Sequence, residues 1–263
     1  HDYAAFRAAT ETLQEPWSKW PETLRDGTLR AGDYSEPLKN YHLYAQWLAD
    51  EQIRPLGKKS GKGALLYLDF PLGVHREGYD VWRQRDVFAL AASGGAPPDD
   101  FFTKGQNWGF PPLHPEKLRN HGYQYYIACL RHQLAYAAQL RIDHIMGLHR
   151  LYWVPHGLEP AEGVYVRYPA AEFYAILSLE SHRHQTVIVG ENLGTVPDSV
   201  QQEMKIQAER CRPGRRGGSG VDLAAVLVDG DPVQVQRDAR GVARLAGELA
   251  RRDQLERAVG HVE

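Results

Sequence analysis

Three carboxylates stand at the ends of short apolar runs, a placement that suits them for chemistry. The runs are ALLYLDF at 64–70, QLRID at 139–143 and TVIVGE at 186–191. They place Asp69, Asp143 and Glu191 after residues that favour buried strands. Two carboxylates in opposed environments can cleave a glycosidic bond, because one attacks the anomeric carbon while the other protonates the leaving oxygen. The first hypothesis is therefore chemistry on sugars.

The segment LRIDHIMGLHRLYW at 140–153 sets an arginine close to one of these carboxylates. Alternate side chains of a strand share a face, so Arg141 and Asp143 point the same way and can form a charge-assisted pair. The arginine favours the ionised form of Asp143, which suits nucleophilic attack. Glu191 follows an apolar run and a glycine, surroundings that favour a protonated general acid. The alternative is a plain buried ion pair of Arg141 with Asp143 or Glu191.

The three runs also predict the fold that positions these residues. They are apolar on both alternating faces and are separated by helical segments, which is typical of buried parallel strands. Apolar residues at three- and four-residue spacing predict helices at 3–13, 41–53, 123–140, 170–181 and 199–207. In the eightfold barrel, the loops after the C-terminal strand ends build the active site. The expected class is α/β, a portion of a (β/α)8 TIM barrel, with the acidic strand ends in one site.

Residues 78–122 interrupt this rhythm with GGAPPDDFF and GQNWGFPP, in which glycine and proline punctuate aromatic and polar residues. This pattern predicts an inserted loop subdomain. Aromatic planes stack on the apolar faces of sugar rings and polar groups bind hydroxyls, so a sugar-binding set is expected here. Its members are Asp99, Phe101, Gln106 and Trp108. The alternative is an insertion without function, with Trp108 in the core.

Composition limits the classes of partner. The 263 residues carry a formal net charge of -2, without the basic excess of proteins that bind nucleic acid or anionic membranes. Two cysteines, Cys129 and Cys211, are too few for a disulfide framework, so we expect a reducing compartment, the cytoplasm. The sequence printed contains neither an apolar run of membrane-spanning length nor a signal segment.

Metal and cofactor motifs are also not expected to contribute. The histidines of HRH at 182–184, and the pair His144 and His149, lack the spacing or acidic partners of a zinc site. The motif GENLG does not match the glycine-rich motifs that bind phosphates. We therefore predict no metal and no cofactor.

The composition changes after about residue 205. Every aromatic residue lies at or before Tyr174, and the segment that opens with ERCRPGRRGGSG is rich in arginine, glycine, alanine and valine. We predict the central part of a barrel catalytic domain at 1–205, with an insertion at about 78–122, and a divergent tail at 206–263. A shifted reading frame or disorder would account for the tail, and a genuine divergent segment is the alternative.

Six motifs in order carry a resemblance to a known family. They are LYLDFPLGV, GYDVW, GGAPPDDFF, GQNWGFPP, LRIDHIMGLHRLYWVPHG and VIVGENLGTVP. From about Phe6 to Met204 the chain resembles the 4-alpha-glucanotransferase family, also called amylomaltase or disproportionating enzyme. The resemblance implies a (β/α)8 barrel that moves 1,4-alpha-glucan segments between maltooligosaccharides by a retaining double displacement.

The resemblance also implies roles for single residues. Asp143 matches the nucleophile, Glu191 the general acid/base and Arg141 the arginine that supports the nucleophile. Substrate-binding roles are expected for the aspartate at the end of the first apolar run, for the four residues of the sugar-binding set at 78–122, and for the histidine that follows Asp143. These residues are Asp69, Asp99, Phe101, Gln106, Trp108 and His144. In the family the acid/base is often followed by aspartate, where this chain has Asn192.

Two departures from the family pattern leave alternatives open. The first barrel strands are expected before His1, and a third catalytic aspartate, in a His-Asp pair, is expected beyond Met204, where no such pair occurs. We therefore interpret the chain as the central part of the enzyme, holding the third to fifth strands. The alternatives are an alpha-glucan hydrolase that uses the same carboxylates with water, and a noncatalytic glucan-binding remnant.

Overall fold

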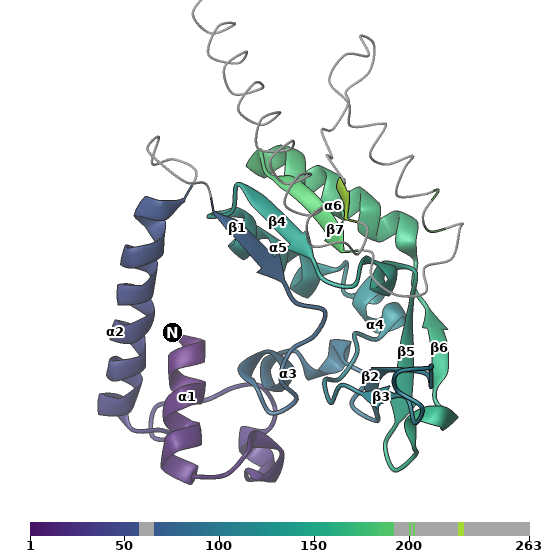
Figure 1. Ribbon diagram of the computed structural model, residues 1–263. Coiled ribbons are helices and arrows are strands. Elements are labelled where there is room, and N and C mark those ends of the chain that lie inside the picture. Colours follow the sequence, from purple (N-terminus) through teal and green to yellow (C-terminus); the bar gives the residue numbers. More distant parts are fainter. Residues whose placement is uncertain (58–65, 192–199, 201, 203–225, 229–263) are drawn as a thin grey trace, which may run out of the picture. The chain divides into compact units, whose positions relative to one another are not determined.

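The computed structural model describes residues 1–57, 66–191, 200, 202 and 226–228, and the chain divides into two compact units (Figure 1). The first unit comprises residues 1–64, 71–129 and 147–169, and the second comprises residues 65–70, 130–146 and 170–263. Most of the predicted helix at 199–207 and of the predicted tail lies outside the described residues. Among the described residues, no helix is long and apolar enough to cross a membrane.

The second unit contains a parallel sheet in the order β1-β4-β7-β8 (Figure 1). Its strands are β1 (Tyr67–Phe70), β4 (Gln139–Ile142), β7 (Val187–Glu191) and β8 (Val226–Val228). The three runs predicted as parallel strands are confirmed as β1, β4 and β7, and β4 pairs with both of the others. The expected burial is wrong for β1, whose residues are exposed or half-buried. The fourth strand, β8, comes from the segment predicted to be a tail and pairs in parallel with β7.

The register separates a polar face of this sheet from an apolar one. Asp69 pairs with Arg141 and Arg141 pairs with Val189, so these positions and every second residue from them share a face. The other face carries Leu140, Ile142 and Ile188, each at most 4% exposed. Burial of these apolar side chains fixes which face the charged residues occupy.

A buried carboxylate joins two helices of the second unit. Glu180 of α6 (Ala170–His184) is 1% exposed and accepts hydrogen bonds of 2.8 Å from Arg131 Nε, Arg131 Nη2 and Arg183 Nη1. Arg131 belongs to α5 (Gln124–Leu134), whose last residues lie in this unit. The hydrogen bonds from Arg131, helped by Arg183, outweigh burial and lower the pKa of Glu180. His184 Nε2 lies 3.7 Å from Glu180 Oε2, so part of HRH serves this cluster.

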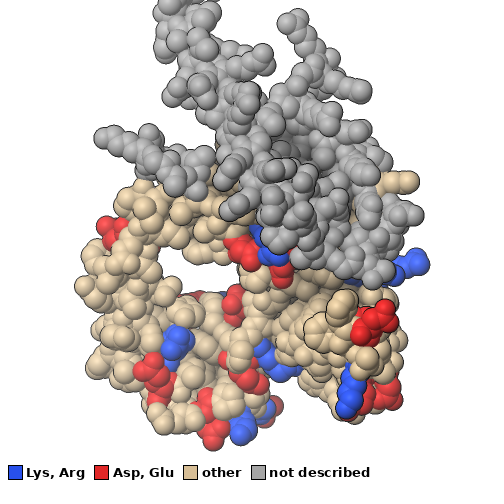
Figure 2. Space-filling model, in the orientation of Figure 1, with Lys and Arg blue, Asp and Glu red and all other residues tan. Residues whose placement is uncertain are grey.

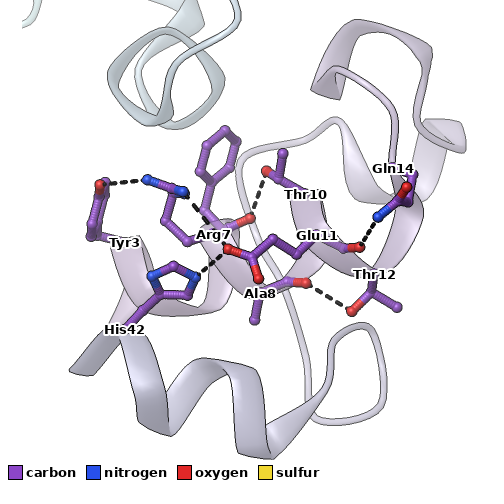
Figure 3. A network of polar contacts seen from close by, with 9 residues as sticks. Tyr3, Arg7, Ala8, Thr10, Glu11, Thr12, Gln14 and His42 are labelled. Carbon is purple, nitrogen blue, oxygen red and sulfur yellow. Dashed lines mark hydrogen bonds and ion pairs between the residues drawn. The ribbon is translucent and has the colours of Figure 1, made fainter. Parts of the chain in front are cut away.

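Two helices of the first unit, α1 (Asp2–Leu13) and α2 (Glu36–Ile53), pack together through a polar network. Figure 3 shows His42 of α2 pointing at Glu11 of α1, with 2.7 Å between His42 Nε2 and Glu11 Oε1. Arg7 Nη2 lies 3.7 Å from the same Glu11 oxygen, and Arg7 Nη1 donates to Tyr3 Oη at 3.3 Å.

The short helices of this unit are η1 (Trp17–Lys19), η2 (Glu22–Leu24), η3 (Arg54–Leu56), α3 (Tyr79–Arg83), η5 (Arg85–Val87), α4 (Pro115–Asn120) and η7 (Pro160–Glu162). Another short helix, η6 (Ile145–Leu148), crosses the boundary between the units.

An aromatic core holds α1 against α3. The ring of Phe6 lies 5.2 Å from that of Trp82 and 5.4 Å from that of Trp20, measured between ring centroids. Both indoles also satisfy their N–H groups, because Trp82 Nε1 donates to Leu24 O and Trp20 Nε1 donates to Glu15 O, each at 2.8 Å. Large aromatic rings contribute apolar burial here without leaving polar atoms unpaired.

The first unit also contains an antiparallel sheet in the order β3-β2-β5-β6. Its strands are β2 (Ala92–Ala96), β3 (Gln106–Asn107), β5 (Arg150–Pro155) and β6 (Val164–Arg167). The predicted insertion at 78–122 covers only β2 and β3, and the other two strands come from a segment that the sequence analysis did not assign to strands. The sequence did not predict β5 and β6 as strands, because a short bulky run such as RLYWVP fits a strand or a core helix equally well. Pairing between strands distant in sequence decides that these segments are strands.

Candidate active site

The polar face of the parallel sheet brings three charged residues into contact. Arg141 Nη1 donates to Asp69 Oδ1 at 2.7 Å, and Arg141 Nη2 lies 2.9 Å from Asp143 Oδ1. The predicted pair of Arg141 and Asp143 is therefore confirmed. The second partner of the guanidinium is Asp69, which the sequence analysis had not paired with it. One planar guanidinium thus holds two carboxylates in fixed positions.

The two carboxylates keep Arg141 charged. Partial burial alone would lower the pKa of Arg141, but its hydrogen bond to Asp69 and the charges of Asp69 and Asp143 raise it overall. The side chain of Asp143 remains 38% exposed, so its carboxylate is both oriented by the arginine and open to solvent. An oriented, accessible carboxylate can attack an electrophilic carbon or stabilise positive charge.

Glu191 ends β7, the strand that pairs with β4 and so brings this residue to the triad. It is 8% exposed, and its Oε2 accepts a hydrogen bond of 2.9 Å from the backbone N–H of His144. His144 directly follows Asp143, so one peptide links the two carboxylates predicted to act together. This turn has a left-handed backbone, with a φ of 50° at His144.

The imidazole of His144 is held neutral by its surroundings. Burial lowers the pKa of His144, against the opposing charges of Glu191 and Asp143. A neutral ring adds no positive charge beside Glu191 at pH 7. The prediction that His144 binds substrate stays a prediction.

A tyrosine that the sequence analysis missed shares this face. Tyr67 lies two residues before Asp69 on β1, pairs in register with Gln139, and is 44% exposed. Partial burial raises the pKa of Tyr67, against the charge of Arg141. The alternation of LYLDF was the signal that could have identified it, because residues at i and i+2 of a strand share a face.

The predicted sugar-binding residues of the loop all lie on the β2–β3 hairpin of the first unit. Phe101 is 92% exposed and Trp108 is 37% exposed, so neither belongs to the core. Asp99 Oδ1 accepts hydrogen bonds from the backbone N–H groups of Phe101 at 2.9 Å and of Phe102 at 2.5 Å. Gln106 Oε1 accepts a hydrogen bond of 3.2 Å from Trp108 Nε1. The polar members of the set therefore order the loop that presents the aromatic rings.

Charges of both signs are mixed on the surface, and no metal-binding cluster is found among the described residues. Figure 2 shows acidic and basic side chains interspersed on one face, without a broad patch of either sign among the described residues of that face. Within the described part of the chain, no group of three or more His, Cys, Asp or Glu residues is arranged to hold a metal ion. The site is thus a set of carboxylates organised by an arginine.

The fold and this site define the class of protein. The described strands form part of a (β/α)8 barrel, with carboxylates at the C-terminal ends of the strands. The family model described as 4-alpha-glucanotransferase matches residues 1–208, and the chain belongs to this family. Two curated relatives carry the same name. The one from Mycobacterium tuberculosis is 37% identical over 213 residues, and the one from Haemophilus influenzae is 40% identical over 212 residues.

Solved structures agree with this assignment. The crystal structure of amylomaltase from Corynebacterium glutamicum matches 78% of the chain with a TM-score of 0.66 and 34% identity. Amylomaltase from Streptococcus agalactiae, solved in complex with acarbose, matches 79% of the chain with a TM-score of 0.70, and at 22% identity it supports the fold alone. The matched regions cover 28% and 44% of those two structures. The matches cover 78% and 77% of this chain but only 29% and 30% of the two curated relatives.

Proposed function

We propose that this chain supplies the central barrel strands of a 4-alpha-glucanotransferase, which transfers 1,4-alpha-glucan segments between maltooligosaccharides. The observation that carries the proposal is the bridge from Arg141 to Asp69 and Asp143, set at the strand ends beside the buried carboxyl group of Glu191. Membership of the family supports the choice of an alpha-glucan as the substrate.

The proposed reaction has two displacements at one anomeric carbon. In the first, Glu191 gives its proton to the glycosidic oxygen while a carboxylate oxygen of Asp143 bonds to the anomeric carbon and the bond to the leaving sugar breaks. In the second, Glu191 takes the proton of the 4-hydroxyl of an acceptor sugar. The acceptor oxygen then bonds to the anomeric carbon and releases Asp143, so configuration is retained.

Each supporting residue has a role that its contacts suggest. Arg141 pairs with Asp143 and orients its carboxylate, and Asp69 holds the second nitrogen of the same guanidinium. The backbone N–H of His144 holds one oxygen of Glu191. Phe101 and Trp108 provide rings for stacking on the sugar chain, and Asp99 and Gln106 order their loop. With only Cys129 and Cys211 present, we place the enzyme in the reducing cytoplasm.

The test is to trap the proposed covalent intermediate. An alpha-maltosyl fluoride reacts without proton donation, because fluoride is a good leaving group. We expect Glu191→Gln to accumulate a glycosyl ester on the peptide that contains Asp143, detected by mass spectrometry, and Asp143→Asn to form none. Asp50→Asn, on α2, is the matched control and should behave like the wild type.

Disproportionation of maltotriose provides the second measurement. In a full-length version of the enzyme, products longer than maltotriose are expected with the wild type and with Asp50→Asn, but not with Asp143→Asn. Transfer that survives in Asp143→Asn, or an ester on another residue, would sink the assignment of the nucleophile.

A further inference from the structure

The ring of Phe110, which the proposed function does not use, occupies a slot between two glycines of the first unit. A Cβ atom added at Gly73 would lie 2.3 Å from Cγ and Cδ2 of Phe110, and one added at Gly94 would lie 2.3 Å from its Cζ. Real Cβ atoms essentially never approach other atoms within 3.0 Å. Glycine at both positions is therefore required for the ring to lie where it does.

Backbone hydrogen bonds fix the segment that carries this ring. Gly94 N–H donates to Phe110 O and Trp108 N–H donates to Gly94 O, both at 2.9 Å. Gly109, between the two aromatic residues, has a φ of 78°, and its N–H donates to Asn107 Oδ1 at 3.0 Å. Because the backbone is held on both sides of this turn, the directions of the Trp108 and Phe110 side chains are set before any ligand binds.

The indole of Trp108 stacks on this immobilised ring. The two ring centroids are 6.1 Å apart and the ring planes are inclined by 19°. Trp108 Nε1 donates to Gln106 Oε1 at 3.2 Å, which holds the indole edge, and the residue stays 37% exposed. The indole is therefore supported from one side and open to solvent on another.

We propose that Phe110 is a positioning residue for carbohydrate binding, which holds the exposed indole of Trp108 ready to stack on a glucose ring of a maltooligosaccharide. The inference rests on the proposed function, because it takes Trp108 as a sugar-stacking residue. A ring that is already immobilised loses little side-chain entropy on binding, so it binds more tightly than a mobile one. Phe110 acts through Trp108, and the slot of Gly73 and Gly94 acts through Phe110.

Fluorine NMR of the chain labelled with fluorotryptophan tests this role. One signal is expected for each of the six tryptophans, and Trp108→Phe identifies the signal of Trp108. Maltoheptaose is then titrated into the wild type, into Phe110→Leu, which removes the ring, and into Gly73→Ala, which fills the slot. In both variants we expect the Trp108 signal to move before sugar is added and the affinity to fall by about 3- to 10-fold.

Two further variants separate positioning from general damage. The double variant Gly73→Ala with Phe110→Leu should bind no more weakly than Phe110→Leu, because the slot acts only through the ring. Tyr44→Leu removes a ring 5.6 Å from the exposed Trp47 on α2 and is the matched control. It should move the Trp47 signal while the Trp108 signal and the affinity stay unchanged.

The outcomes distinguish the two proposals. An unmoved Trp108 signal in Phe110→Leu, or additive losses in the double variant, would overturn the role of Phe110. Weaker binding by Trp108→Ala with unchanged binding by Phe110→Leu would do the same and leave the proposed function intact. A wild type that does not respond to maltoheptaose, or unchanged binding by Trp108→Ala, would overturn the sugar-stacking role of Trp108 and this inference with it.

Discussion

Replacing Glu180 by glutamine should loosen the helical layer of the second unit. Its Oε1 accepts two hydrogen bonds and its Oε2 accepts one, all of 2.8 Å from arginine donors. An amide oxygen in the Oε1 position would keep two weakened bonds, and the amide N–H₂ in the Oε2 position would face an Arg131 donor. Loss of one hydrogen bond to a charged group costs about 1.5–3 kcal/mol. Because both arginines are 51% exposed and regain water, we expect a loss of about 2 kcal/mol.

Amide hydrogen exchange measured by mass spectrometry is the suitable assay. All six tryptophans lie in residues assigned to the first unit, so tryptophan fluorescence would not report on α6. A loss of about 2 kcal/mol predicts about 30-fold faster exchange in peptides from α6 and β7, with peptides from α1 unchanged. Glu116→Gln, on the exposed surface of α4, is the control and should change neither. Unchanged exchange of α6 in Glu180→Gln would refute the reasoning.

The pH dependence provides a second check on the same residue. The pKa of Glu180 is lower in the folded chain than in the unfolded chain, so its contribution is complete above the unfolded value of about 4.3. That contribution is lost as the pH falls through the lower folded value. The protection of α6 amides against hydrogen exchange should therefore fall more steeply with decreasing pH in the wild type than in Glu180→Gln. Equal steepness would contradict the assigned role of Arg131 and Arg183.

Three further predictions concern the hairpin, the buried thiol and the turn after β4. Gly95→Ala places a Cβ atom 2.2 Å from Gln106 O and should destabilise the β2–β3 hairpin by about 1–3 kcal/mol. The expected readout is faster proteolysis at residues 97–105, and an unchanged rate of proteolysis would refute the prediction. Burial raises the pKa of Cys129 to about 11. In a Cys211→Ser background, the alkylation of Cys129 should therefore be slow at pH 8 and its rate should rise about tenfold for each pH unit up to pH 10. A rate that reaches a plateau near pH 8.5 would contradict this. At His144, asparagine tolerates the left-handed backbone and valine does not. His144→Val should therefore be less stable than His144→Asn by about 1–2 kcal/mol in urea unfolding. Equal stability of the two variants would exclude strain at this turn.

The sequence by itself determined the strands that carry the candidate site and one of its contacts. Continuous apolar runs bounded by polar residues identified β1, β4 and β7 as strands, although the residues of β1 are exposed or half-buried. The alternation in RID predicted the contact of Arg141 with Asp143, since the period of a strand is fixed by its backbone. These predictions succeeded because they depend on local geometry alone.

Only the tertiary structure decided which distant residues meet. The register of β1 against β4 placed Asp69 at Arg141, and the left-handed turn at His144 aimed its N–H at Glu191. The predicted helix at 123–140 ends at Leu134 because Gln139 enters the sheet, and β5 and β6 extend the sheet of β2 and β3. Strand pairing, the slot for Phe110 and the three bonds to Glu180 arise from residues far apart in the chain. Periodicity along a sequence contains no information on such encounters, because they depend on how the buried faces of different elements fit together.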